Sequence, residues 1–184
     1  MQTSKKVQEA LDQIADQRKG LLEASSGLSE AQLDYKPAEA EWSISDILHH
    51  MALTDEGGAR LAANMLKQAE EKKLPADPRP EASVLNSLDE FNPQLAGTKV
   101  QAPDRVAPRS HLPAAESIVR LKSSRENVVA TWAQLGEYDL SGLTYPHPLL
   151  GELNAYQWLI ILGRHESRHT AQIARIKADP GFPG

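Results

Sequence analysis

Four long segments of the chain repeat apolar residues at helical spacing, and this pattern constrains the fold more than any other feature. The segments cover residues 4–24, 43–73, 114–135 and 154–177. Within each, apolar side chains recur at intervals of three and four with polar residues between them, as in a helix that buries one face. No segment shows a convincing alternation of apolar and polar residues. The pattern predicts an all-α four-helix bundle with a long crossover connection, and a more irregular all-α fold stays open as an alternative.

Local signals indicate where two of these helices begin. Ser43 suits an N-cap and Asp46 follows three residues later, an Asp variant of the capping box. Asn154 is a good N-cap for the last helix. Inside the second segment the pair Gly57 and Gly58 weakens the helix, and can mark a kink, a break or a close approach of another helix.

The longest irregular stretch, residues 75–113, joins the second and third helices. It contains seven prolines, and we expect one short helix inside it near residues 82–91. Long connections in compact domains are often lids or binding loops, but this one can equally wrap the surface. Two shorter connectors are expected, residues 30–41 with one helical turn and residues 137–153.

Length, charge and composition restrict the kinds of protein to which this chain can belong. With 184 residues we expect one domain, residues 1–184, large enough for a substantial core. The net charge of -5 and the scattered Lys and Arg residues argue against nucleic acid and anionic membranes as partners.

Cysteine is absent, so a disulfide, an Fe–S cluster and a catalytic thiolate are excluded. Charges throughout the first 20 residues indicate no signal peptide, and a cytoplasmic protein is expected.

Two of the six histidines stand at a spacing that suits a metal. His165 and His169 are four residues apart, which places their side chains one above the other on a helix. Both belong to the apolar stripe that faces the core, together with Trp158, Leu162, Ile173 and Ile176. Buried imidazoles need partners for their ring nitrogens. A shared metal ion meets this need, and hydrogen bonds to Asp, Ser or backbone groups meet it equally well.

A third histidine can join this pair. His50 lies in one helical stripe with Ile47, Met51 and Thr54, so we expect it to point inward, whereas His49 is expected nearer the boundary. Three histidines from two helices would form an open tripod with a vacant position for water or substrate. Asp46 can orient His50, although its role as a cap accounts for it equally.

His111, His147 and Glu166 are expected to have no role in the site. His111 and His147 lie in proline-rich connectors and are expected at the surface. The sequence HESRH at residues 165–169 matches the H-E-x-x-H pattern of zincin proteases, in which the glutamate is a general base. Only 15 residues follow His169 and they include no Glu, so a third zincin ligand is missing. We therefore expect Glu166 on a solvated helix face.

Several stretches together resemble a known family. Residues 41–50 read EWSISDILHH, residues 147–151 read HPLLG, residues 154–158 read NAYQW and residues 165–173 read HESRHTAQI. The first is similar to the W-S-x-x-x-h-x-x-H opening of the DinB-like (DinB/YfiT) superfamily. The others are similar to its closing signature, with H-x-x-x-H-x-x-Q-I. The order of helices matches across nearly the whole chain.

This resemblance implies an up-down-down-up four-helix bundle with one divalent metal ion on His50, His165 and His169. The ion implied is zinc or nickel, with iron or manganese as alternatives. Characterised members include thiol-dependent enzymes, such as S-transferases and an isomerase, and many form homodimers. The resemblance thus implies a metal-dependent thiol S-transferase acting on a small-molecule substrate, with a low-molecular-weight thiol as partner. A metal-dependent hydrolase and a non-catalytic metal-binding or stress-response module stay open as alternatives, so whether the protein is an enzyme is undecided.

Overall fold

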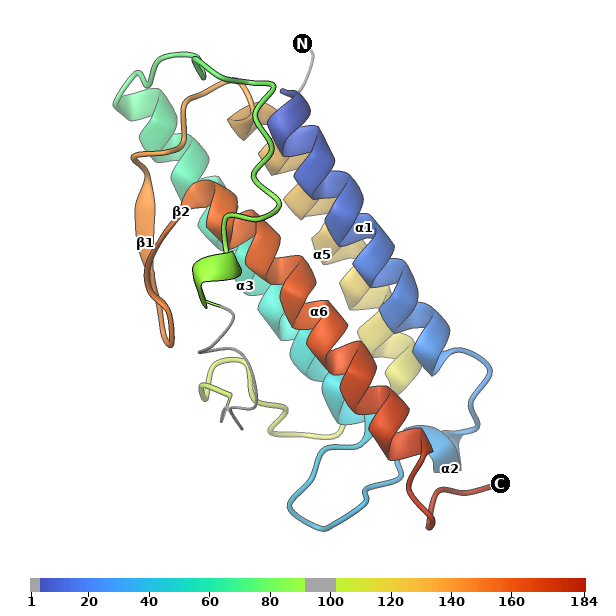
Figure 1. The fold of residues 1–184 in the computed structure, drawn as a ribbon. Helices are drawn as coiled ribbons and strands as arrows, with labels where there is room; N and C mark the ends of the chain where they lie inside the picture. Colours follow the sequence, from blue (N-terminus) through green and yellow to red (C-terminus); the bar gives the residue numbers. More distant parts are fainter. Residues whose placement is uncertain (1–3, 92–101) are drawn as a thin grey trace.

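Four long helices form the body of the molecule, as the apolar pattern predicts (Figure 1). The computed structural model describes residues 4–91 and 102–184. The bundle consists of α1 (Lys5–Ser25), α3 (Ile44–Glu71), α5 (Ala114–Leu135) and α6 (Ala155–Lys177). Their bounds lie within two residues of those expected from the sequence, and the all-α four-helix bundle is confirmed.

The helices pair in parallel, α1 with α6 and α3 with α5 (Figure 1). In the first pair Lys6 lies over the ring of Tyr156 near the start of both helices, and Lys177 reaches the carbonyl of Ala24 near their ends. The two pairs run in opposite directions, which gives the expected up-down-down-up order. Because α3 and α5 are parallel, the connection between them starts and ends at opposite ends of the bundle.

Capping side chains fix the start of two helices. The Ser43 hydroxyl accepts from the backbone N–H of Asp46 at 3.1 Å, and the Asp46 carboxylate accepts from the N–H of Ser43 at 3.1 Å. Asn154 and Gln157 form the same reciprocal pair at the start of α6. Asp46 also lies 2.8 Å from Lys36. Asp46 is therefore a capping residue, and the alternative that it orients His50 is not supported.

Close helix contact, and not a kink, explains Gly58, whereas a Cβ atom on Gly57 would meet only the Arg60 side chain of the same helix. Helix α3 continues without a break through Gly57 and Gly58. A Cβ atom on Gly58 would lie 3.0 Å from a methyl group of Leu162 in α6. Gly163, the next residue in α6, meets α1 in the same way, because its Cβ would lie 2.9 Å from Ile14. Small residues thus bring α6 close to both of its neighbours.

Of the two short helices expected in the connectors, one forms as an α-helix and the other does not. The single turn expected in residues 30–41 is confirmed as α2 (Glu30–Leu33). The helix predicted near residues 82–91 is wrong, because only the 3-10 turn η1 (Asp89–Phe91) forms there. Side chains of α6 hold this segment on the bundle: Gln157 donates to the carbonyl of Ser87 and Arg164 donates to that of Leu88.

A β-hairpin, which the sequence did not reveal, precedes α6. Strands β1 (Thr144–His147) and β2 (Gly151–Asn154) pair antiparallel, with Tyr145 opposite Leu153. Each strand has four residues and β1 contains Pro146, so no alternating pattern of useful length exists. Side chains from the bundle hold β1 in place: Trp158 of α6 donates to the Tyr145 carbonyl, and Gln68 of α3 donates to the Tyr145 hydroxyl.

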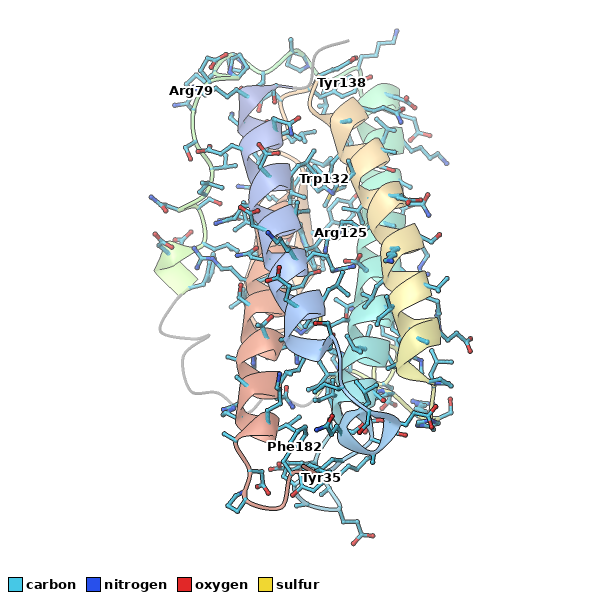
Figure 2. All side chains as sticks on the ribbon, turned by 90° about the vertical axis from the view of Figure 1, so that its right-hand side faces the viewer. Tyr35, Arg79, Arg125, Trp132, Tyr138 and Phe182 are labelled. Carbon is cyan, nitrogen blue, oxygen red and sulfur yellow. The ribbon has the colours of Figure 1, made fainter. Side chains whose placement is uncertain are left out.

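The core consists of two apolar layers separated by buried charges. One layer fills the end of the bundle where α1 begins, and the other fills the end where α3 begins. Between them lie four charged residues, one from each long helix: Arg18 of α1, Asp55 of α3, Arg125 of α5 and Glu166 of α6. We call these four residues the central ion network. Figure 2 shows Arg125 reaching inward from α5, with Trp132 of the first layer above it.

The central ion network is closed and electrically balanced. The Arg18 guanidinium lies 3.0 Å from Asp55 and 2.5 Å from Glu166, and Arg125 contacts the same two carboxylates. Arg18 also donates to the carbonyl of Leu121 at 2.9 Å. Asp55 and Glu166 are 1% and 0% exposed, so water cannot replace these partners. Such groups are tolerated in a core because each charge faces its opposite.

None of the helices in the described part of the chain has the length and apolar character needed to cross a membrane.

Neutralising one carboxylate of the central ion network should destabilise the fold strongly. Glu166→Gln keeps the size of the side chain but leaves two guanidinium groups facing one carboxylate. We expect the free energy of unfolding in urea to fall by about 3–5 kcal/mol. The control is Glu56→Gln, which breaks a partly exposed pair with Arg120 and should cost less than about 1 kcal/mol. Equal losses in the two variants would contradict a special role for the network.

Candidate metal centre

Helices α3 and α6 bring His50, His165 and His169 together. His50 lies in the second turn of α3, His165 lies next to the middle of the antiparallel α6, and His169 lies in its second half. The Nε2 atom of His165 is 3.2 Å from Nε2 of His50 and 2.9 Å from Nε2 of His169. The ligand nitrogens of all three lie within 4.8 Å of one another. The sequence-predicted set of ligands is therefore assembled in one place.

Hydrogen bonds on the far side of two rings determine which nitrogen carries the proton. Nδ1 of His50 is 2.7 Å from the carbonyl oxygen of Val106, which can only accept. Nδ1 of His169 is 2.9 Å from the side-chain oxygen of Gln172. Both Nδ1 atoms therefore donate, and both Nε2 atoms direct lone pairs towards His165. This arrangement is typical of histidines that bind a metal through Nε2.

The donor set fits a divalent metal ion. A proton on Nε2 of His165 can serve one neighbouring lone pair but not two, so hydrogen bonding alone leaves the cluster unsatisfied. Nitrogen ligands at 2.0–2.1 Å from a tetrahedral ion are about 3.3 Å apart, close to the separations found here. Imidazole nitrogens suit zinc, nickel, copper and iron. Three neutral protein ligands also match an open metal site.

Burial keeps the three imidazoles neutral. It is the largest cause of the lowered pKa of each ring, and it takes the pKa of His169 to about 3. The pKa of His165 lies well below its usual value, because His169 and His50 add to the effect of burial. The Arg168 guanidinium lowers the pKa of all three rings further. Near neutral pH the rings are thus unprotonated, which is the state that binds metal.

Trp42 forms an aromatic wall beside the cluster. Its ring centroid lies 4.8 Å from that of His50 and 6.2 Å from that of His169, with the latter ring nearly parallel. Trp42 immediately precedes the Ser43 cap, so the start of α3 fixes its position. The sequence motif contains this residue, but periodicity alone did not identify it as part of the site.

The crossover connection also reaches the cluster, through Val106. The structure thus favours a role at the site for part of residues 75–113 over simple surface wrapping. The central part of this segment, residues 92–101, lies outside the described residues. The backbone carbonyl of Val106 carries no sequence signal, so its role could be found only in the folded structure.

The other three histidines lie outside the cluster. His111 is exposed and 3.9 Å from Asp34, as expected for a surface residue. His49 is buried, although we expected it nearer the boundary, because the first two turns of α3 are covered on several faces. His147 is half-buried on β1, with its ring centroid 5.1 Å from that of Trp158. As expected, His147 is not part of the three-histidine cluster, but its side chain is only partly exposed because the hairpin packs on α6.

The expected solvated position of Glu166 is also wrong. Its carboxylate is fully buried and accepts from Arg18 and Arg125. Burial raises its pKa, while the two guanidinium groups lower it. A carboxylate held in this way is not available as the general base of an H-E-x-x-H protease. The zincin interpretation is thus not supported by the geometry.

The sequence carries a signal for the central ion network. Arg18 continues the apolar stripe formed by Val7, Leu11, Ile14 and Leu21 in α1. Arg125 stands between Leu121 and Val128 in the stripe of α5. A single charge inside an apolar stripe, repeated in several helices, indicates a buried ion pair.

Comparisons with known proteins agree with the fold and the motif. A family model described as the DinB superfamily matches residues 13–173. The chain is 31% identical over 152 residues to the "Uncharacterized protein YuaE" of Bacillus subtilis (strain 168), covering 82% of this chain and 86% of that protein. It is also similar to the solved structure titled "Crystal structure of TT2238, a four-helix bundle protein". That match has a TM-score of 0.60 and 20% identity, and covers 92% of this chain and 98% of the other.

Removing any one of the three imidazoles should abolish stoichiometric metal binding. We expect the wild type to hold one divalent ion per chain, and His50→Ala, His165→Ala and His169→Ala to lose most of it, because two ligands hold a metal far more weakly than three. Elemental analysis after gel filtration measures the content, and His111→Ala is the matched control. A variant of the cluster that keeps its full metal content would exclude that histidine from the site.

Proposed function

The chain belongs to the DinB superfamily, and from this membership we propose that it is a metal-dependent enzyme of the thiol S-transferase type. The single observation that carries the proposal is the convergence of three neutral Nε2 atoms from His50, His165 and His169. The lone pairs of two of them are oriented by Val106 and Gln172. Such an arrangement is costly for a core unless a cation is bound there.

The charge of the ligand set supports a reaction that involves an anion. A divalent ion bound by three neutral imidazoles would keep its full double charge and would lower the pKa of a bound thiol or water. We propose zinc or nickel as the ion, with iron or manganese as alternatives. Imidazole ligands suit zinc, nickel and iron, whereas manganese prefers oxygen ligands and is kept as an alternative from the family resemblance. The chain has no cysteine, so the thiol must come from a cosubstrate.

The residues of this chain supply orientation and shelter from water. Val106 and Gln172 fix the rings of His50 and His169, so the ligand atoms need no rearrangement to bind. The Trp42 ring forms an apolar wall against two of the imidazoles. An apolar wall strengthens electrostatic interactions at the site because it excludes solvent. A small organic electrophile can pack against such a surface.

A test of activity distinguishes this proposal from its alternatives. For a thiol S-transferase, consumption of a small electrophile such as 1-chloro-2,4-dinitrobenzene should require both the metal-loaded protein and an added low-molecular-weight thiol. His169→Ala should reduce the rate at least about 100-fold, since it removes a metal ligand, while circular dichroism shows the helical content retained.

The other outcomes identify the alternatives. Turnover of an activated ester without thiol, rising with pH as bound water ionises, would indicate a hydrolase and contradict the transferase proposal. Rates no higher than those of the free ion in buffer would indicate a non-catalytic metal-binding module.

The homodimer implied by the family resemblance stays a prediction. We expect multi-angle light scattering at micromolar concentration to give twice the chain mass of 20.2 kDa. We expect the dimer to form through helix faces and not through the metal. The measurement should therefore give the same mass for the chelated protein. A mass of one chain in both samples would contradict the prediction.

A further inference from the structure

The outer face of α5 carries a regular row of exposed side chains. Among the residues that the structure describes, three large apolar side chains are exposed, and two of them, Val119 and Val129, lie on α5 with exposed fractions of 66% and 40%. Both belong to a row in which spacings of four and three residues alternate. We call this row the α5 seam: Ala115, Val119, Lys122, Glu126, Val129 and Ala133. Such a repeat of 3.5 residues is the pattern with which one helix packs lengthwise on another.

The α5 seam is turned away from the core of its own chain. At 100° per residue its six members fall within about 80° of one another, about 140° from the mean direction of the residues that α5 buries. Five members are exposed and Ala133 is half-buried. Figure 2 shows Arg125 and Trp132 directed from α5 into the bundle, which leaves the seam on the side turned to solvent.

The seam has the same kinds of side chain when it is read from either end. Its members form three pairs that lie equally far from Ser124 in the sequence. A two-fold axis perpendicular to α5 at the level of Ser124 would therefore place Val119 opposite Val129 of a second copy. It would also place Ala115 opposite Ala133, and Lys122 opposite Glu126. Closed dimers of this symmetry use one self-complementary surface, which is what the seam provides.

The two charges of the seam favour the antiparallel arrangement. None of the ion pairs found among the described residues uses Lys122 or Glu126. Within one helix, Lys four residues before Glu is the less favourable order for such a pair. Two antiparallel seams place each Lys122 against Glu126 of the other copy, whereas two parallel seams would place like charges together.

We infer that α5 is the dimer interface of this chain, and that two copies pack their α5 seams antiparallel about a two-fold axis at the level of Ser124. The inference names the face and the symmetry of the homodimer that the family resemblance implies. It does not depend on the proposed function, because none of the three histidines of the candidate metal centre lies on α5.

The size of the seam indicates a reversible dimer. From Ala115 to Ala133 it is about 27 Å long, at 1.5 Å per residue. Its apolar side chains are only valine and alanine, so the contact belongs to the small interfaces and not to the obligate ones. We therefore expect a dimer Kd of about 1 μM.

Exchange of the two charges tests the inference by sedimentation equilibrium of the full chain over a series of protein concentrations. Lys122→Glu places carboxylates opposite one another twice across the axis, and Glu126→Lys does the same with ammonium groups. We expect each single variant to raise the dimer Kd at least about 10-fold. The double variant, Lys122→Glu with Glu126→Lys, restores opposite charges and should return the Kd to within about 3-fold of that of the wild type.

Lys19→Glu is the matched control. Lys19 is exposed on α1 and stands four residues before Glu23, as Lys122 stands before Glu126. This variant changes the net charge by the same amount and should leave the dimer Kd unchanged. All the substituted positions are exposed, so the melting temperature of each variant should stay that of the wild type.

A mixture of the two single variants tests the direction of the helices. In an antiparallel pair, the two Glu side chains of the Lys122→Glu chain face the two Lys side chains of the Glu126→Lys chain. We therefore expect the mixture to form a heterodimer, although each variant alone dissociates. Labelling one of the chains with ¹⁵N allows native mass spectrometry to identify it.

The outcomes separate this inference from the proposed function. A wild type that sediments as one chain at every concentration, or a Lys122→Glu variant with an unchanged Kd, would overturn the α5 interface. A double variant or a mixture that does not dimerise would overturn its antiparallel arrangement. Metal content and thiol-dependent turnover are measured on the same samples, and their absence from a wild type that does dimerise would contradict only the proposed function.

Discussion

The central ion network is the constraint on which the rest of the structure depends. One charged side chain from each long helix meets at the middle of the bundle, between two apolar layers. Apolar layers tolerate a helix that slides or rotates by a small amount, because one aliphatic contact can replace another. A buried charge does not tolerate this, since a shifted helix would leave it without a partner. The network therefore sets the height and rotation of all four helices, while the apolar layers supply most of the stability.

This constraint reaches the candidate metal centre through α6. Glu166 is adjacent to His165, and on a helix neighbouring residues point in directions about 100° apart. Holding Glu166 between Arg18 and Arg125 thus directs His165 and His169 towards α3. Asp55 acts in the same way on α3, a little more than one turn after His50. Two helices that are separately fixed by the network therefore present their imidazoles to one another before any metal binds. A site prepared in this way would bind an ion without a cost for rearrangement.

The sequence predicted the elements that depend on periodicity and missed those that depend on the fold. The four helices, the Ser43 and Asn154 caps and the inward direction of His50 follow from spacing along one chain segment. Glu166 is buried, against expectation, because its partners Arg18 and Arg125 come from two other helices, α1 and α5, which the spacing within α6 does not reveal. The hairpin was missed because its strands are short, and its stability depends on contacts with Trp158 and Gln68. Val106 acts through a backbone carbonyl, which any residue would supply.

The bundle and its connections contribute different parts of the site. Membership of the family therefore predicts the three-histidine cluster better than it predicts a reaction. The three imidazoles come from α3 and α6, whose geometry the central ion network fixes. The groups that contact them come from irregular segments: Val106 from the crossover connection and Trp42 from the residues before α3. Connections change sequence and length with little effect on a core, whereas the helices cannot. A bundle of this kind can therefore keep one three-histidine cluster while its connections change the groups that surround it.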